Sequence, residues 1–163
     1  MVGPAVGRGR AVNLSGALSI VAAGLAGQFA PLRVESHGGR FTEREIAMLL
    51  GKAPCVLAAV LGVSRVTARG RERWAADLRL GAYCLGADTP AESRADLAMD
   101  RAIEIVDLLP AQLWGKTDQD CRPPDIDTIA ADNLYTGHIN NLRVALWAVA
   151  WTQTFFFDHG VPP

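Results

Sequence analysis

Residues 74–83, Trp-Ala-Ala-Asp-Leu-Arg-Leu-Gly-Ala-Tyr, alternate between two kinds of side chain. One face of an extended chain would carry Trp74, Ala76, Leu78, Leu80 and Ala82. The other face would carry Asp77, Arg79 and Tyr83. A period of two is typical of a β-strand with one buried face and one wetter face. We therefore predict that this stretch is a strand of a sheet that is covered on one side.

A second strand is predicted just before it. Pro54 opens a continuous apolar run from Cys55 to Val63, which suits a strand that is buried on both faces. Residues 64–73 are polar and basic, and they predict a loop. The two strands and this loop would form an antiparallel pair.

Another strand pair is predicted near the C-terminus, from Ile126 to Tyr135 and from Leu142 to Phe157, with a turn over 136–141. In the second of these strands, Trp147 and Trp151 would share the face opposite to Leu146. Exposing two indole rings to water is costly, so a helix or a neighbouring subunit should cover them.

Three helices complete the prediction. Residues 13–29 carry apolar side chains at helical spacing, and Pro31 ends that helix. Thr42 and Glu45 have the spacing of a capping box, which predicts a helix that closes at Gly51. Residues 88–109 form the third helix, whose core stripe is Ala95, Ala98, Ala102, Ile105, Val106 and Leu109.

The order of elements predicts an α+β fold, in which about three helices pack on a mainly antiparallel sheet. We expect residues 11–163 to form a single domain, since 163 residues are the size of one ordinary domain. A short strand is also expected over 32–36. Residues 1–10 are rich in Gly, Arg and Pro, and are expected to be a flexible N-terminal arm.

Composition limits the kinds of partner. Half of the residues are hydrophobic and only 20% are charged, which favours a surface that meets another subunit. The net charge of −1 gives no overall field that would attract nucleic acid or an anionic membrane. The run from Ala11 to Ala30 follows Arg8 and Arg10, so a signal peptide or a membrane span remains an alternative to the first helix.

The sequence carries no recognisable catalytic motif. Phosphate-binding glycine loops and the G-x-S-x-G nucleophile pattern are both missing. His37 stands beside two glycines and is expected to serve a turn. The aspartates between Asp118 and Asp132 follow no known calcium-loop order, and three widely spaced cysteines suit neither zinc nor a disulfide framework. We therefore assign no catalytic, cofactor-binding or metal-binding residue, and we predict no enzyme activity and no cofactor.

The basic stretch between the first two strands has a different character. It contains Arg65, Arg69, Arg71 and Arg73. A solvated loop is the simplest explanation, and contact with a protein partner or with phosphate groups are the alternatives, although no aromatic residues are interleaved as in nucleic-acid modules.

From Leu14 to Phe155, the sequence resembles the tail terminator (tail completion) proteins of Mu-like phages and prophages. The resemblance rests on a succession of short motifs. They are His37-Gly38-Gly39, the Pro-led strand from Pro54 to Gly62, the helix from Arg94 to Leu109, the stretch Ala131 to Tyr135, and the aromatic strand from Leu146 to Gln153.

This resemblance implies a structural protein of the virion neck, assembled in the host cytoplasm. It would form a hexameric ring that caps the tail tube, ends tube polymerisation and provides the surface for head–tail joining. Its partners would be its own copies, the tail tube protein and a head–tail connector or stopper protein. DNA would only pass through the ring lumen, and no membrane is expected.

Two surfaces follow from these expectations. The predicted subunit interface consists of Trp147, Trp151, Phe155, Phe156 and Phe157. The predicted contact with the tube or the connector consists of Arg65, Arg69, Arg71 and Arg73. The alternatives to a tail terminator are another phage neck or head-completion connector, a small hydrolase that uses His37 and the acidic loop, and a secreted domain.

Overall fold

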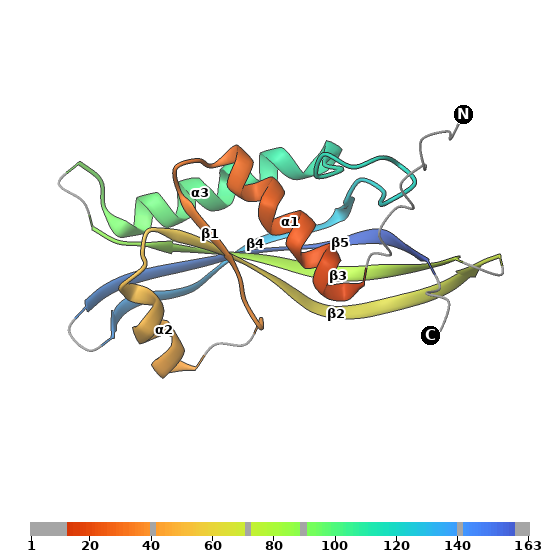
Figure 1. Cartoon of the computed structure of the whole chain (residues 1–163). Helices are drawn as coiled ribbons and strands as arrows, with labels where there is room; N and C mark the ends of the chain where they lie inside the picture. The colour runs from red at the N-terminus through yellow and green to blue at the C-terminus, as the bar shows by residue number, and fades with distance from the viewer. Residues whose placement is uncertain (1–12, 40–41, 71–72, 89–90, 140–141, 159–163) are drawn as a thin grey trace, which may run out of the picture.

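A computed structural model of the chain describes residues 13–39, 42–70, 73–88, 91–139 and 142–158. The elements in chain order are α1 (Leu14–Gln28), β1 (Arg33–Ser36), α2 (Glu43–Leu50), β2 (Cys55–Arg69), β3 (Arg73–Gly86), α3 (Arg94–Leu108), the 3-10 turn η1 (Leu109–Ala111), β4 (Asp125–Ile139) and β5 (Leu142–Asp158) (Figure 1). The predicted N-terminal arm, residues 1–10, lies outside the described residues.

The strands form a single five-stranded sheet in the order β1-β2-β3-β5-β4. Strand β1 runs parallel to β2, and every other neighbouring pair is antiparallel. The α+β class predicted from the sequence is therefore confirmed. Both of the predicted antiparallel pairs are present, and β3 joins them by pairing with β5.

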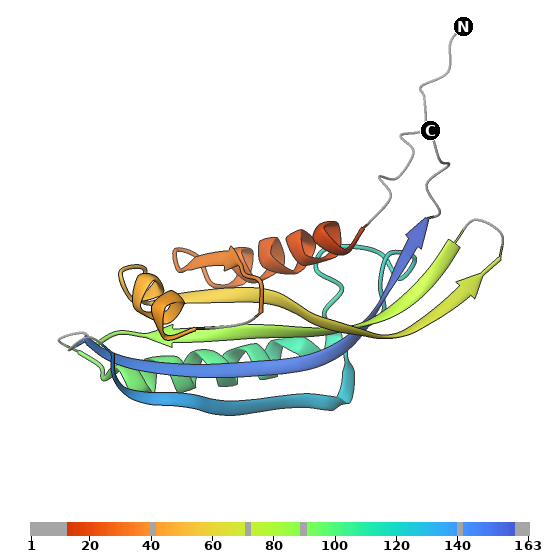
Figure 2. The same ribbon diagram turned by 90° about the horizontal axis from the view of Figure 1, so that it is seen from below.

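Two helices cover one face of this sheet and one helix covers the other. Figure 1 shows α1 and α3 above the sheet and α2 below it, and Figure 2 shows the same layers from below. The larger core lies under α1 and α3, where Val21, Ile105 and Leu80 are buried together. A smaller core lies on the opposite face, where Leu49 of α2 packs near Leu57 and Tyr83.

Side-chain caps fix where the helices begin. The predicted capping box is confirmed: the Glu45 backbone N–H donates to the Thr42 hydroxyl at 3.2 Å, and the Glu45 carboxylate accepts from the Thr42 N–H at 2.9 Å. Asn13 caps α1 by accepting from Gly16 N–H at 2.7 Å. Helix α3 begins later than predicted, because Ser93 is its N-cap.

The predicted loop over 64–73 is wrong. Strand β2 continues to Arg69 and β3 starts at Arg73, so most of this stretch is paired in register, for example Val66 with Ala76. Residues 136–139, predicted as a turn, likewise belong to β4. The apolar pattern fades beyond Gly62 because no helix covers the strand there, and the strand signal in the sequence depends on burial.

Gly86 gives a direct test of how α3 sits on the end of β3. A Cβ atom at Gly86 would lie 2.0 Å from the Arg94 carbonyl oxygen and 3.1 Å from the Ala98 Cβ, so the helix would have to shift. We expect Gly86→Ala to lower the free energy of unfolding by at least about 2 kcal/mol in urea denaturation.

Gly62 is the matched control, because a Cβ there meets nothing within 4 Å. Gly62→Ala should change the same free energy by less than about 1 kcal/mol. Equal effects of the two substitutions would contradict the described packing of α3 against β3.

Candidate interaction site on the β2–β3 hairpin

The end of the β2–β3 hairpin projects beyond α1 and α3 (Figures 1 and 2). We call residues 62–70 and 73–79 the hairpin extension. All β2 residues from Gly62 onward are exposed, including Val63 at 44% and Val66 at 62%. Their partners on β3, Leu78 and Ala76, are fully buried. The two valines therefore continue the core face of the sheet into a region that no helix of the described chain covers.

A pocket of about 340 Å³ lies on this part of the molecule. We call it the arginine pocket; it is lined by Arg69, Arg73, Asp118, Gln119, Arg122, Pro123 and Phe156. The lining joins three segments that are distant in the sequence: the tip of the hairpin, the segment before β4, and the end of β5. Its volume is at the low end of the range for ligand pockets and is enough for a few side chains of a partner.

Phe156 lines the arginine pocket and has two guanidinium groups near its ring. The guanidinium carbon of Arg69 is 5.3 Å from the ring centroid, and that of Arg122 is 5.8 Å away. Such cation–π contacts hold a guanidinium group in place without neutralising its charge. Both groups therefore keep hydrogen-bond donors for an acidic partner.

The third arginine of the pocket is already neutralised. Arg73 Nε lies 2.8 Å from the Asp158 carboxylate, and Arg73 also donates to the Gln119 carbonyl at 2.9 Å. Among the described residues, no ion pair involves Arg69 or Arg122. Asp118 is the only acidic residue among those that line the pocket. The pocket therefore keeps an excess of positive charge.

The segment that carries Arg122 is held by Gln153, a buried polar residue of β5 that is 1% exposed. Its side-chain oxygen accepts from the indole N–H of Trp114 at 2.8 Å and from that of Trp151 at 3.3 Å. Its side-chain nitrogen donates to the carbonyls of Gln112 at 3.0 Å and Arg122 at 2.7 Å. One amide thus satisfies two buried indole N–H groups and two partly buried carbonyls, and ties residues 112–122 to the sheet.

Backbone contacts extend this connection to the pocket. The Arg122 N–H donates to the Thr154 carbonyl, and the Phe156 N–H donates to the Asp120 carbonyl, both at 2.9 Å. Residues 120–122 therefore pair with the end of β5, on the same edge that β4 pairs with further along the strand. This arrangement places Arg122 beside Phe156.

The structure corrects most of the predicted subunit interface. Trp151, Phe155 and Phe157 are each 1% exposed and belong to the core under the helices. Phe157 stacks on Trp74 with ring centroids 4.4 Å apart. Trp147 is half-buried and packs against the same core. The chain itself covers Trp151, Phe155 and Phe157, so these three side chains leave no surface for a neighbouring subunit.

Phe156 is the exception within this set, because alternate residues of a strand point to opposite faces. It is half-buried and belongs to the arginine pocket. Of the four predicted basic contacts, Arg69 and Arg73 line the same pocket. Arg65 lies outside it, 3.8 Å from Asp77 with 77% of its side chain exposed, and Arg71 lies outside the described residues.

Sequence reasoning missed Arg122 and Gln153. A polar residue between Thr152 and Thr154 gave no sign that it would be buried. Arg122 followed an irregular stretch whose path could not be traced from local patterns. The pair Pro123-Pro124 gave a partial signal, since it ends any regular element immediately after Arg122.

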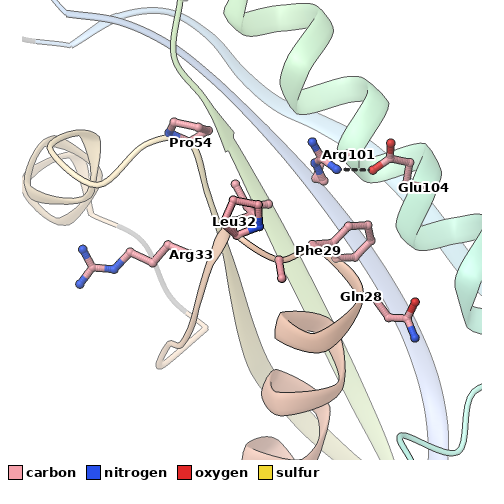
Figure 3. A pocket seen from close by; sticks show the side chains of 9 residues that line it. Gln28, Phe29, Leu32, Arg33, Pro54, Arg101 and Glu104 are labelled. Carbon is pink, nitrogen blue, oxygen red and sulfur yellow. Dashed lines mark hydrogen bonds and ion pairs between the residues drawn. The ribbon is translucent and has the colours of Figure 1, made fainter.

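A larger pocket, of about 660 Å³, lies where α1 ends and β1 begins, next to α3 (Figure 3). Its ionic groups are paired: Arg101 with Glu104 at 2.5 Å, and Arg33 with Glu35. Arg101 also lies over the Phe29 ring, 5.4 Å from its centroid. Because these charges are already neutralised, this pocket presents less to a charged partner than the arginine pocket does.

The histidine and cysteine side chains that the sequence singled out lie in a turn or are buried in the protein. The imidazole Nδ1 of His37 accepts from the Gly39 N–H at 3.0 Å, as expected for a turn histidine. Burial raises the pKa of the Cys84 thiol to about 12, and burial also raises those of Cys55 and Cys121 to about 11. All three are free and buried. At neutral pH they are protonated, which makes them poor nucleophiles.

Two absences hold for the part of the chain that the structure describes. Within it, no group of three or more His, Cys, Asp or Glu side chains is placed to hold a metal ion. Within the same residues, no helix is both long and apolar enough to cross a membrane. Helix α1, the segment in question at the N-terminus, packs Ala17, Val21 and Leu25 into the core.

The role of Gln153 can be tested by Gln153→Leu, which keeps the size of the side chain but removes its four hydrogen bonds. Two buried indole N–H groups would be left without partners, at about 1–3 kcal/mol for each, and two partly buried carbonyls would lose a donor. We expect a loss of at least about 3 kcal/mol in the free energy of unfolding, and faster proteolysis within residues 112–122. Gln28→Leu, at an exposed position of α1, is the control and should have little effect. Similar stability of the two variants would show that Gln153 does not hold this segment.

No family model matches the chain, and no curated protein matches it. What the chain does is therefore inferred from the hairpin extension, the arginine pocket and the motifs that resemble those of tail terminators.

Proposed function

We propose that the chain is a structural assembly protein that closes into a ring of its own copies. In the terms of the tail terminator resemblance, the ring caps a phage tail tube, ends its polymerisation and offers a surface for head–tail joining. Six copies are the number that the resemblance implies.

The observation that carries this proposal is the hairpin extension. Val63 and Val66 lie on the face of the sheet that helices cover elsewhere, and yet they are exposed. A monomer gains nothing from extending an apolar face into water. A second protein chain that covers the extension would account for it, and this supports assembly.

The sheet also offers a second, different surface. Strand β4 is the last strand in the sheet order, and its outer edge has no partner strand among the described residues. Ile126 and Leu134 of β4 are 63% and 51% exposed. Contact between two unlike surfaces is heterologous, and such contacts build a ring when the rotation between copies closes. An extension at one end of the sheet and an open edge at the other side suit this geometry.

The remaining surfaces of such a ring are available for the other partners. One rim would meet the tail tube protein and the opposite rim the connector or stopper protein. DNA would pass through the lumen, without the base contacts that sequence recognition needs. These roles require binding surfaces and no catalytic group.

The ring can be tested with the purified chain. We expect light scattering coupled to size exclusion to give about six times the monomer mass of 17.4 kDa, and electron microscopy to show discrete closed rings. A ring with more subunits would favour another neck or head-completion connector. A chain that stays monomeric at high concentration, even with tail tube protein added, would contradict the proposal.

A pair of variants shows whether the hairpin extension takes part. Val66→Asp should reduce the assembled fraction, because it places a charge on a surface that the neighbour buries. Met48→Asp on α2 is the matched control, since Met48 is 63% exposed and Val66 is 62% exposed. The control should assemble as the unmodified chain does.

A further inference from the structure

The outer side of α3 is acidic. Asp96, Asp100, Glu104 and Asp107 are all exposed, whereas Ala98, Ala102 and Ile105 face the core. Glu104 is paired with Arg101. Among the described residues, Asp100 and Asp107 have no ion-pair partner. Helix α3 therefore offers uncompensated carboxylates to the solvent.

An exposed apolar side chain lies between these two carboxylates. Ile103 is 49% exposed, and with Asp100 and Asp107 it has the spacing i, i+3, i+7, which puts the three on one side of the helix. We call these three residues the acidic stripe. Its order along the helix is charge, apolar, charge.

The arginine pocket has the complementary order. Phe156 lies between the guanidinium groups of Arg69 and Arg122, 5.3 and 5.8 Å from the ring centroid. The guanidinium carbons of Arg69 and Arg122 can therefore be no further apart than the sum of these two distances. Seven residues of α-helix rise about 10 Å, which separates Asp100 from Asp107 by a similar length.

We propose that the arginine pocket binds the acidic stripe of a second copy of this chain. The contact deepens the proposed ring by naming one part of its subunit interface, on the face of the sheet opposite to Val63 and Val66, and it rests on that proposal. Asp100 and Asp107 of one copy pair with Arg69 and Arg122 of the next, and the Ile103 side chain packs on Phe156. Charge-assisted hydrogen bonds set the register, and the central apolar pair is shielded from water.

The contact joins different copies because a chain cannot make it with itself. Helix α3 packs on the face of the sheet that holds Trp151 and Val149. Phe156 points to the opposite face, since it alternates with the buried Phe155 and Phe157. The pocket and the stripe thus lie on opposite sides of the sheet. Each copy presents its pocket to one neighbour and its stripe to the other, which makes the contact heterologous.

A protein carboxylate suits this pocket better than a nucleic-acid backbone. Arg73 is held by Asp158, and Asp118 lines the pocket, so only a small excess of positive charge remains. Two carboxylates bring one negative charge to each of the two guanidinium groups, whereas a phosphate chain would bring repeated charge next to Asp118.

Charge-swap variants test the contact. The pocket variant is Arg69→Glu with Arg122→Glu, and the stripe variant is Asp100→Arg with Asp107→Arg. Each variant alone places like charges together, and each should need at least about tenfold more protein for half-assembly. An equimolar mixture should restore assembly, because alternating copies meet only opposite charges. A control with the same charge change as the pocket variant, Arg44→Glu with Lys116→Glu, should assemble normally, since both positions are exposed and lie outside the pocket and the stripe.

The restored mixture also shows that both variants fold. If the unmodified chain forms rings and both variants alone do so equally well, this contact is wrong while the proposed ring stands. If the unmodified chain never assembles, the proposed ring and the contact both fail. Variants that stay apart when mixed would overturn the pairing of pocket with stripe. Binding of single-stranded DNA that the pocket variant loses and the stripe variant keeps would assign the pocket to nucleic acid instead.

Discussion

The side chain of Gln153 is the point on which the rest of the structure depends. A primary amide in a dry core must satisfy two donors and two acceptor positions, and here it does so with Trp114, Trp151, Gln112 and Arg122. The irregular segment between α3 and β4 has little regular structure of its own, so this amide fixes its path. The same contact determines where Arg122 can reach, and so connects the core to the surface.

Because alternate residues of β5 point to opposite faces of the sheet, the aromatic residues at its end have two different roles. Phe155 and Phe157 complete the core beneath the helices, and Phe156 supports the arginine pocket on the other face. The strand extends past the helices along with the hairpin, so the sheet is longer than its own cover. In a monomer, a sheet that extends beyond the helices packed on it is stable only if its uncovered end is polar. Here Val63 and Val66 make the end partly apolar, which is why we expect another copy to cover it.

Much of this fold could be predicted from the sequence, because its core elements follow strong local patterns. The capping box at Thr42 and Glu45 appears as predicted, and 74–83 is a strand, but Tyr83, predicted on its wetter face, is buried in the second core beneath α2. The hairpin extension could not be predicted, since exposed strand and polar loop have the same composition. The site was predicted only in part: Arg69, Arg73 and Phe156 were named, but the three phenylalanines were treated as one surface although a period of two separates them. Arg122 and Gln153 come together with these residues only through long-range contacts.

The central claim is that the next copy contacts the end of the sheet, with its Ile103 against Phe156 on the face opposite to Val63 and Val66. The three native cysteines are buried, so engineered thiols at the surface would react selectively. A chain carrying Phe156→Cys and Ile103→Cys, mildly oxidised and then denatured without reductant, measures this contact directly. The account predicts a ladder of covalent oligomers that ends at the size of the ring. Monomer alone, at concentrations where the ring is intact, would contradict it.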